Sequence, residues 1–313
     1  MTPATSDAIG GRLAEHARML WGVCYRMTGS AADADDLVQE TFVRAMERPP
    51  ASLAEPIAPW LLRVAVNLGR DALRRRKRRS YVGPWLPSPI EADEVASFEI
   101  GGEPGTEGRY DLIESVSFAF LLALEVLTPS QRAVLILRDV LDRSVRETAE
   151  TLGMSEANVK VVHHRARKAL EPYEASRATT RPSPEVAKST AEALQRFIVA
   201  LGSGDESTVA NLFAEGVESL SDGGGVFLAS RVVVRGPSRV AKMFLGLTRK
   251  GSAVERFAVR MINGTPMFVA ERTPRAATEA PRFVMGFEVD AAGKITRVYT
   301  VLAPEKMTRV PKV

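Results

Sequence analysis

Residues 145–170 read VRETAETLGMSEANVKVVHHRARKAL, and the spacing of their small, glycine and apolar positions predicts a helix-turn-helix. Ala149 is small, as required where two helices cross closely. Gly153 follows four residues later, where the turn needs a left-handed backbone. Ser155 is placed to cap a second helix. The stretch therefore predicts two short helices, with Val159 and Val162 burying the second.

The second of these helices carries polar and basic side chains that suit DNA. The N-terminal end of such a helix enters a major groove in helix-turn-helix proteins. A helical hairpin in a protein core is the alternative, but the basic character of the helix favours DNA binding. The candidate DNA-binding residues are Ser155, Glu156, Asn158, Lys160, His163, His164, Arg165 and Arg167. Adjacent histidines point about 100° apart on a helix, so we expect no metal site there. We also expect no cofactor.

A basic helix is predicted at residues 60–79, where eight basic residues stand against one acid. One face is apolar at helical spacing, and the other carries Asn67 among arginines. A charge run alone is usually a solvated face, but an amide that can hold a base favours nucleic-acid binding. The candidate residues are Arg63, Asn67, Arg70, Asp71, Arg74, Arg75 and Arg76.

The helix predicted before it, within DADDLVQETFVRAM, has an acidic exposed face. Acids near a helix start suit the helix dipole, which is one explanation for them. They would also repel DNA, so any partner of this face is expected to be a protein with a basic surface. The candidate residues are Asp35, Asp36, Gln39 and Glu40.

Composition divides the 313 residues into four regions. Residues 10–79 and 114–173 read as helical domains, and 80–113 reads as an acidic linker rich in proline and glycine. Residues 185–313 begin with helices and continue as hairpins, one around Asn263-Gly264 and one around 291–293, which predicts a separate α+β domain. The linker is expected to add a salt-sensitive contact by lying against the basic helix.

Cysteine content and the N-terminus bear on the location of the protein. A single cysteine, Cys24, excludes an internal disulfide and a cysteine-based zinc site. The N-terminus lacks a basic segment followed by an apolar one, and no apolar run approaches the ~18 residues of a membrane span. We expect a cytoplasmic protein without membrane contact.

The three helical stretches together resemble an extracytoplasmic-function sigma factor of bacterial RNA polymerase. The matching sequences are GSAADADDLVQETFVRAM, PWLLRVAVNLGRDALRRRKRR and the stretch from LTPSQRAVLILRDVLDRS into the helix-turn-helix. The resemblance implies two all-α sigma domains and the partners core RNA polymerase, through its β′ clamp and β flap, and promoter DNA. It further implies that the acidic helix docks on the clamp, that the basic helix melts and captures the −10 element, and that residues 155–167 read the −35 element.

The resemblance extends to the subgroup with a C-terminal SnoaL-like domain, a cone with a curved, mainly antiparallel sheet. YVGPWLPSP, SDGGGV at 221–226 and APEKM at 303–307 are similar to its signatures, although Val226 and Ala303 depart from the usual lysine and asparagine. The resemblance implies a built-in regulator that replaces a separate anti-sigma factor. The implied interdomain residues are Trp85, Leu86, Pro87, Asp222, Gly223, Gly224, Gly225, Pro304, Glu305 and Lys306. Because Trp85 and Leu86 are too large and apolar to leave in water, we expect them to pack near 222–225 or 304–307.

Two other functions are open from the residues. A polyketide-cyclase-like enzyme would use Asp222 or Glu288, but all three histidines lie before residue 180, so no His-Asp pair exists in the C-terminal domain. Catalysis is therefore not expected, whereas an apolar pocket that holds an unidentified small molecule is compatible with the fold. A ligand-sensing helix-turn-helix regulator would instead bind a palindromic operator as a dimer.

Overall fold

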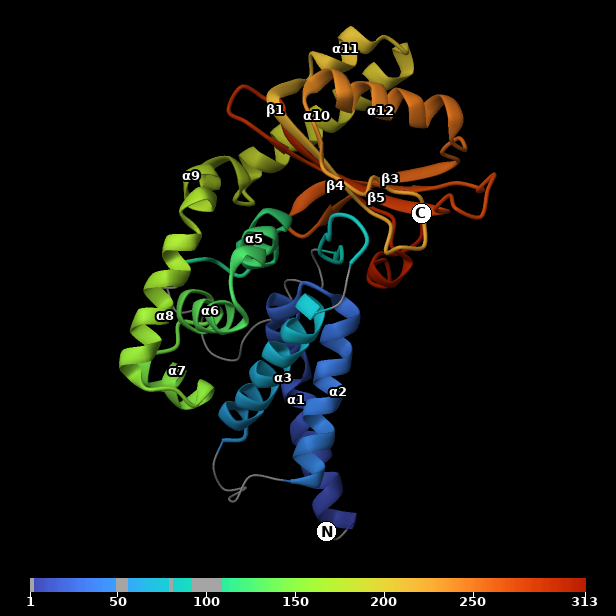
Figure 1. Cartoon of the computed structure of the whole chain (residues 1–313). Helices are drawn as coiled ribbons and strands as arrows, with labels where there is room; N and C mark the ends of the chain where they lie inside the picture. Colours follow the sequence, from blue (N-terminus) through green and yellow to red (C-terminus); the bar gives the residue numbers. More distant parts are fainter. Residues whose placement is uncertain (1–2, 49–55, 79–80, 92–108) are drawn as a thin grey trace. The chain divides into compact units, whose positions relative to one another are not determined.

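The computed structural model describes residues 3–48, 56–78, 81–91 and 109–313, and the chain forms two compact units (Figure 1). The first unit comprises Met1–Arg79, Asp93–Val116 and Ala123–Pro172. The second comprises Ser80–Ala92, Ser117–Leu122 and Tyr173–Val313. The acidic stretch 92–108, for which a contact with the basic helix is expected, lies outside the described residues.

The first unit opens with three packed helices: α1 (Pro3–Thr28), α2 (Ala31–Glu47) and α3 (Ala58–Arg78). Helix α2 begins at Ala31 because the Ser30 hydroxyl accepts a hydrogen bond from the Asp33 amide at 3.2 Å. Gly29, with φ of 68°, makes the preceding turn. The buried side chains between these helices include Leu20, Leu37, Leu61, Ala65 and Leu68.

The rest of the first unit is also helical. Its elements are η1 (Glu114–Val116), η2 (Leu124–Val126), α6 (Pro129–Leu135), a π-helical turn η3 (Ile136–Val140), α7 (Val145–Leu152) and α8 (Glu156–Ala169). Thr128 and Gln131 form a capping box that starts α6. Arg26 of α1 is fully buried and donates to the Ser115 hydroxyl at 2.7 Å, which joins this part of the unit to the first three helices.

The second unit combines helices with one six-stranded sheet. Its helices are α5 (Phe118–Ala123, all but its last residue), α9 (Glu171–Thr180), α10 (Pro184–Ser203), α11 (Glu206–Ala210), α12 (Pro237–Lys250) and the 3₁₀ turn η4 (Pro304–Lys306). Its strands are β1 (Phe213–Asp222), β2 (Val234–Arg235), β3 (Arg256–Ile262), β4 (Thr265–Glu271), β5 (Arg282–Val289) and β6 (Ile295–Val301).

The strand order is β2-β1-β6-β5-β4-β3, and every neighbouring pair is antiparallel except β1 with β6. Asn263 and Gly264 both have positive φ, 51° and 79°, as a two-residue hairpin loop between twisted strands requires. The hairpins predicted around these residues and around 291–293 are confirmed. The α+β fold with a mainly antiparallel sheet is therefore confirmed.

Both faces of β4, inside this sheet, are buried, so this strand is apolar on both sides and does not alternate (Figure 1). On one face Phe268 and Ala270 pack with α10 and α12 around Phe197. On the other face Met267 and Val269 pack with Leu86, Phe118 and Met307. No helix within the described ranges has both the length and the apolar character needed to cross a membrane.

Candidate functional site

The helix-turn-helix is built as its sequence predicts. Ser144 and Glu147 form a capping box at the start of α7, and Gly153 closes it in the left-handed conformation, with φ of 63°. The Ser155 hydroxyl accepts a hydrogen bond from the Asn158 amide at 3.2 Å and caps α8. Val159 is buried, but Val162 is only half-buried. The exposed candidates are the cap residue Ser155 and, on α8, Glu156, Asn158, Lys160, His164, Arg165 and Arg167.

His163 and Arg167 differ from the other candidates on α8 because both bind Asp139 of η3. Nε2 of His163 lies 2.9 Å from one Asp139 carboxylate oxygen, and Nη2 of Arg167 donates to that oxygen at 2.6 Å. Asp139 is 2% exposed, and its backbone carbonyl accepts a hydrogen bond from the Tyr110 amide. Burial opposes ionisation of Asp139, but the hydrogen bonds from His163 and Arg167 outweigh burial and lower its pKa. This carboxylate therefore fixes the rotation of α8 about its axis.

The basic helix α3 presents only part of its charge to solvent. Arg63, Asp71, Arg74 and Arg75 are exposed, and Arg74 pairs with Asp71 at 2.8 Å. Arg70 is half-buried and joins Asn67 to Ser130 at the start of α6, donating at 3.0 and 3.1 Å. Burial and the neighbouring Arg74 lower the pKa of Arg70.

Further along α3, two more basic side chains form hydrogen bonds to residues between 123 and 135. Arg76 donates to both carboxylate oxygens of Glu125, at 2.6 and 2.7 Å, and the Lys77 ammonium donates to the Leu127 carbonyl at 3.0 Å. Glu125 also accepts from the buried Arg132 at 2.7 Å. Burial opposes ionisation of Glu125, but the two arginines outweigh it and lower its pKa. Arg70, Arg76 and Lys77 of α3 thus all form hydrogen bonds to the segment that contains α6.

Replacing Glu125 by glutamine is expected to raise the affinity of the full chain for a single-stranded −10 oligonucleotide about tenfold. The resemblance implies that Arg76 contacts phosphate of the −10 element, and the change removes a charge-assisted contact of about 1.5–3 kcal/mol that would compete with it. Fluorescence anisotropy at fixed salt measures the change. Glu147→Gln, which alters an exposed pair with Arg143 on α7, is the matched control and should leave the affinity unchanged. Equal affinities for wild type and Glu125→Gln would contradict the expectation.

The acidic helix α2 places its four candidates near one exposed strip. Asp36, Gln39 and Glu40 are exposed, and Glu40 pairs with Arg44 at 2.8 Å. Asp35 accepts a hydrogen bond from the Trp21 indole at 2.7 Å, so it also joins α2 to α1. Val43 and Met46 are exposed at 41% and 39% and follow Gln39 at helical spacing. These apolar side chains, which the sequence analysis missed, extend the acidic strip with an exposed apolar end.

In the second unit, Asp222 at the end of β1 binds the linker. It is fully buried, and each of its carboxylate oxygens accepts two hydrogen bonds. The Tyr81 hydroxyl and the Gly224 amide donate to Oδ1 at 2.5 and 3.0 Å. The Leu86 amide and the Lys306 ammonium donate to Oδ2 at 2.8 and 2.6 Å. We call this arrangement the Asp222 clamp.

Lys306 completes the clamp from the C-terminal side. Its ammonium is 4.9 Å from the Tyr81 ring centroid and 4.5 Å from that of Trp85, and it donates to the Leu86 carbonyl at 2.6 Å. The packing expected for Trp85 and Leu86 is confirmed, with Leu86 fully buried among β-strand side chains. A Cβ on Gly224, which has φ of 62°, would lie 2.6 Å from Glu305, so only glycine fits there.

The linker continues from the clamp to the edge of the sheet. Glu91 forms an antiparallel bridge with Ile262 of the edge strand β3, and Ile90 exchanges two hydrogen bonds of 2.9 Å with Asn263. Arg260 pairs with Glu91 at 2.8 Å. Residues 81–91 are therefore held at both ends, and part of the sheet edge is covered.

Neither carboxylate offered for catalysis is free. All four lone-pair positions of Asp222 are used by the clamp. Glu288 accepts hydrogen bonds from the Tyr299 hydroxyl and from Arg297. Burial raises the pKa of Glu288.

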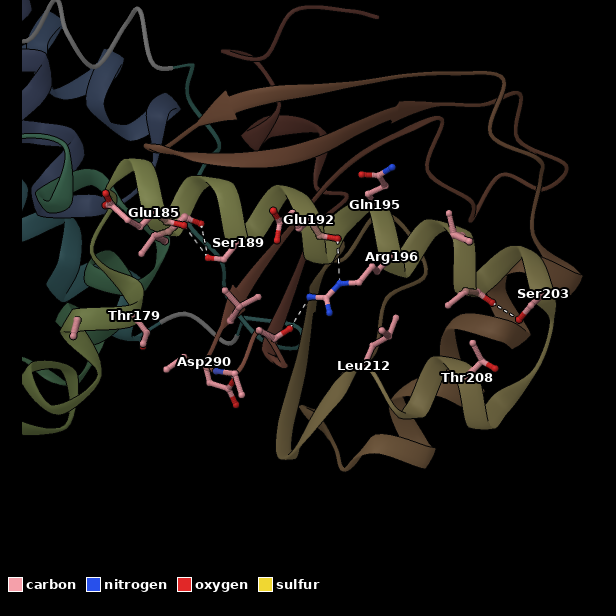
Figure 2. A pocket seen from close by; sticks show the side chains of 18 residues that line it. Thr179, Glu185, Ser189, Glu192, Gln195, Arg196, Ser203, Thr208, Leu212 and Asp290 are labelled. Atoms are coloured by element: carbon pink, nitrogen blue, oxygen red, sulfur yellow. Dashed lines mark hydrogen bonds between the residues drawn. The ribbon is translucent and has the colours of Figure 1, made fainter.

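An open groove of about 1150 Å³ runs along α10 in the second unit. Figure 2 shows Arg196 reaching across it, where the guanidinium donates to the Gly293 carbonyl at 2.9 Å. Glu185, Glu192 and Asp290 also line it. None of the site residues predicted from the sequence lies in this groove.

Comparison with known proteins defines the class first. The chain matches Sigma-70 region 2 over residues 13–79 and Sigma-70, region 4 over residues 117–170. It is 31% identical over 305 residues to "ECF RNA polymerase sigma factor SigJ" of Mycobacterium tuberculosis, covering 93% of this chain and 91% of that one. It is 35% identical over 236 residues to SigG of the same organism, covering 70% and 63%.

A solved structure agrees with these sequence matches. The crystal structure of the M. tuberculosis extracytoplasmic function sigma factor SigJ superposes with a TM-score of 0.70 at 26% identity, covering 94% of this chain and 96% of that one. The chain therefore belongs to the family of ECF RNA polymerase sigma factors and carries a fused C-terminal α+β domain. The family and fold class expected from the sequence are confirmed.

Proposed function

We propose that this chain acts in the cytoplasm as a promoter-specificity subunit of RNA polymerase, and that its C-terminal domain restrains it through the Asp222 clamp. Docking on core polymerase is assigned to the acidic strip of α2. Contact with the −10 element is assigned to α3, and −35 recognition to the exposed residues of α8. No chemistry is assigned to the C-terminal domain, because the clamp uses every acceptor position of Asp222.

The observation that carries the restraint is the burial of the linker backbone in the C-terminal domain. Lys306 and Asp222 bind the carbonyl and the amide of the same linker residue, Leu86, which follows the helical domain at residues 10–79. A linker held at these points cannot extend freely between the two DNA-binding domains that it connects. Promoter binding that requires a larger separation of these two domains therefore competes with the clamp.

Run-off transcription with core polymerase tests both parts of the proposal. Leu86→Glu, which places a charge at a fully buried position, should raise the yield of promoter-dependent transcript about tenfold or more at limiting protein. Val82→Glu, at a neighbouring position that is 51% exposed, is the control and should behave as wild type. Equal yields from wild type and Leu86→Glu would refute the restraint. No promoter-dependent initiation by the full chain or by any C-terminal truncation would refute the assignment of function.

A further inference from the structure

A small polar cavity lies in the second unit between α5, α10 and the sheet. It measures about 20 Å³, which is room for one water molecule. Phe118 of α5 forms one wall, and Glu288, Tyr299 and Thr190 contribute polar groups to the others. Phe118 is 3% exposed, and its ring centroid is 5.5 Å from that of Tyr299. An aromatic ring of the protein therefore closes a polar site.

One polar atom of a residue that lines this cavity has no hydrogen-bond partner in the structure. Thr190 is 1% exposed, and its hydroxyl has no hydrogen-bond partner in the structure. Such a buried hydroxyl without a partner costs free energy, and a ligand that binds it would recover that cost. The Glu288 side chain is 11% exposed, and its carboxylate adds acceptor positions beside the cavity.

Phe118 belongs to one domain by sequence and to another by packing. The match to Sigma-70, region 4 begins at residue 117, yet Ser117–Leu122 packs within the second unit, against the face of the sheet that also holds Leu86. The first turn of the sigma-70 region 4 match thus packs on the sheet of the C-terminal domain, as a covalently attached ligand would. Any free molecule that takes its place must compete with a tethered phenyl ring.

We propose that this cavity, enlarged by the departure of Phe118, is a binding site for a small aromatic compound bearing one hydroxyl or amino group. The ring of the ligand replaces Phe118 against Tyr299, and its polar group hydrogen-bonds to Thr190 and Glu288. Binding frees Ser117–Leu122 from the sheet. The consequence for transcription rests on the function proposed above, whereas the binding itself does not.

Benzyl alcohol and toluene serve as probes, because they share the ring and differ in the hydroxyl. In the full chain carrying Phe118→Ala, benzyl alcohol should bind at least tenfold more tightly than in wild type, as measured by ligand-observed NMR titration. It should also bind about fivefold more tightly than toluene, a preference that Thr190→Val removes. Phe120→Ala is the matched control, since Phe120 is fully buried on the same helix but packs on Tyr173 outside the cavity.

Equal binding of benzyl alcohol by Phe118→Ala and Phe120→Ala, or no preference over toluene, would overturn the proposal. If Phe118→Ala does not fold, 4-fluorophenylalanine at position 118 of an otherwise wild-type chain tests the same proposal. Saturating benzyl alcohol should produce a second fluorine resonance with the shift of an exposed ring, and a single unmoved resonance would count against the site. If the probe binds but run-off transcription does not rise, the site stands and the restraint proposed for the C-terminal domain fails.

Discussion

Replacing Lys306 by methionine is expected to weaken the protection of the Leu86 amide against hydrogen exchange by roughly 100- to 5000-fold. Removing one partner of a buried ion pair costs about 3–5 kcal/mol, because the remaining charge stays buried without compensation. Asp222 is fully buried, and Lys306 is 4% exposed, so the pair meets that condition. Exchange is measured on the full chain by mass spectrometry with fragmentation or by NMR.

Two further variants make this expectation specific. Asp222→Asn combined with Lys306→Met removes both charges, so the double variant should lose less protection than the sum of the two single variants. Lys242→Met removes the cation of an exposed pair with Glu206 on the same domain and should change the Leu86 protection less than fivefold. Additive losses in the double variant would mean that Lys306 and Asp222 act separately, contrary to the clamp.

Replacing Asp139 by asparagine is expected to lower the affinity for a −35 duplex about 10- to 100-fold. The substitution weakens the hydrogen bonds that hold His163 and Arg167, and the rotation of α8 is then no longer fixed. The loss should be similar for every −35 sequence, because Asp139 positions the helix and reads no base. The exposed His164→Ala is the comparison, and its effect should depend on the sequence of the duplex.

The pH dependence of stability gives a second measurement on Asp139. Its pKa in the folded chain is below the ordinary value of 3.8. The carboxylate therefore stabilises the fold above about pH 4, and this contribution is lost as the pH falls through the lowered pKa. Chemical denaturation between pH 5 and pH 2 should show a shallower acid decline for Asp139→Asn than for wild type. Parallel declines would mean that Asp139 does not have the partners described.

The sequence was informative wherever one short segment determines the geometry. The helix-turn-helix depends on Ser155, three residues from the amide it caps, and on a glycine at the left-handed position 153. The hairpin at Asn263-Gly264 is equally local. The docking of Trp85 and Leu86 was predictable because large apolar side chains between prolines need cover, and the resemblance had marked the segments 221–226 and 303–307.

Features that join distant segments were not predictable from local patterns. Glu125 binds Arg76 across 49 positions, and the Tyr81 hydroxyl reaches Asp222 across 141. Asp139 left one signal, an acid within the apolar run VLILRDVL, which a search for charges inside buried segments would have found. The parallel pairing of β1 with β6 joins segments about 80 residues apart, as between Glu218 and Arg297, and no local pattern marks it.

The position of Lys306 along the chain also sets when the clamp can close during synthesis. Leu86 leaves the ribosome 220 residues before Lys306. At roughly 5–20 residues per second, this interval is about 10–45 s. Every new chain therefore passes through a period in which both DNA-binding domains have been made but the cation of the clamp has not. Under the proposed restraint, translation speed over residues 171–306 would set how long an unrestrained nascent chain exists.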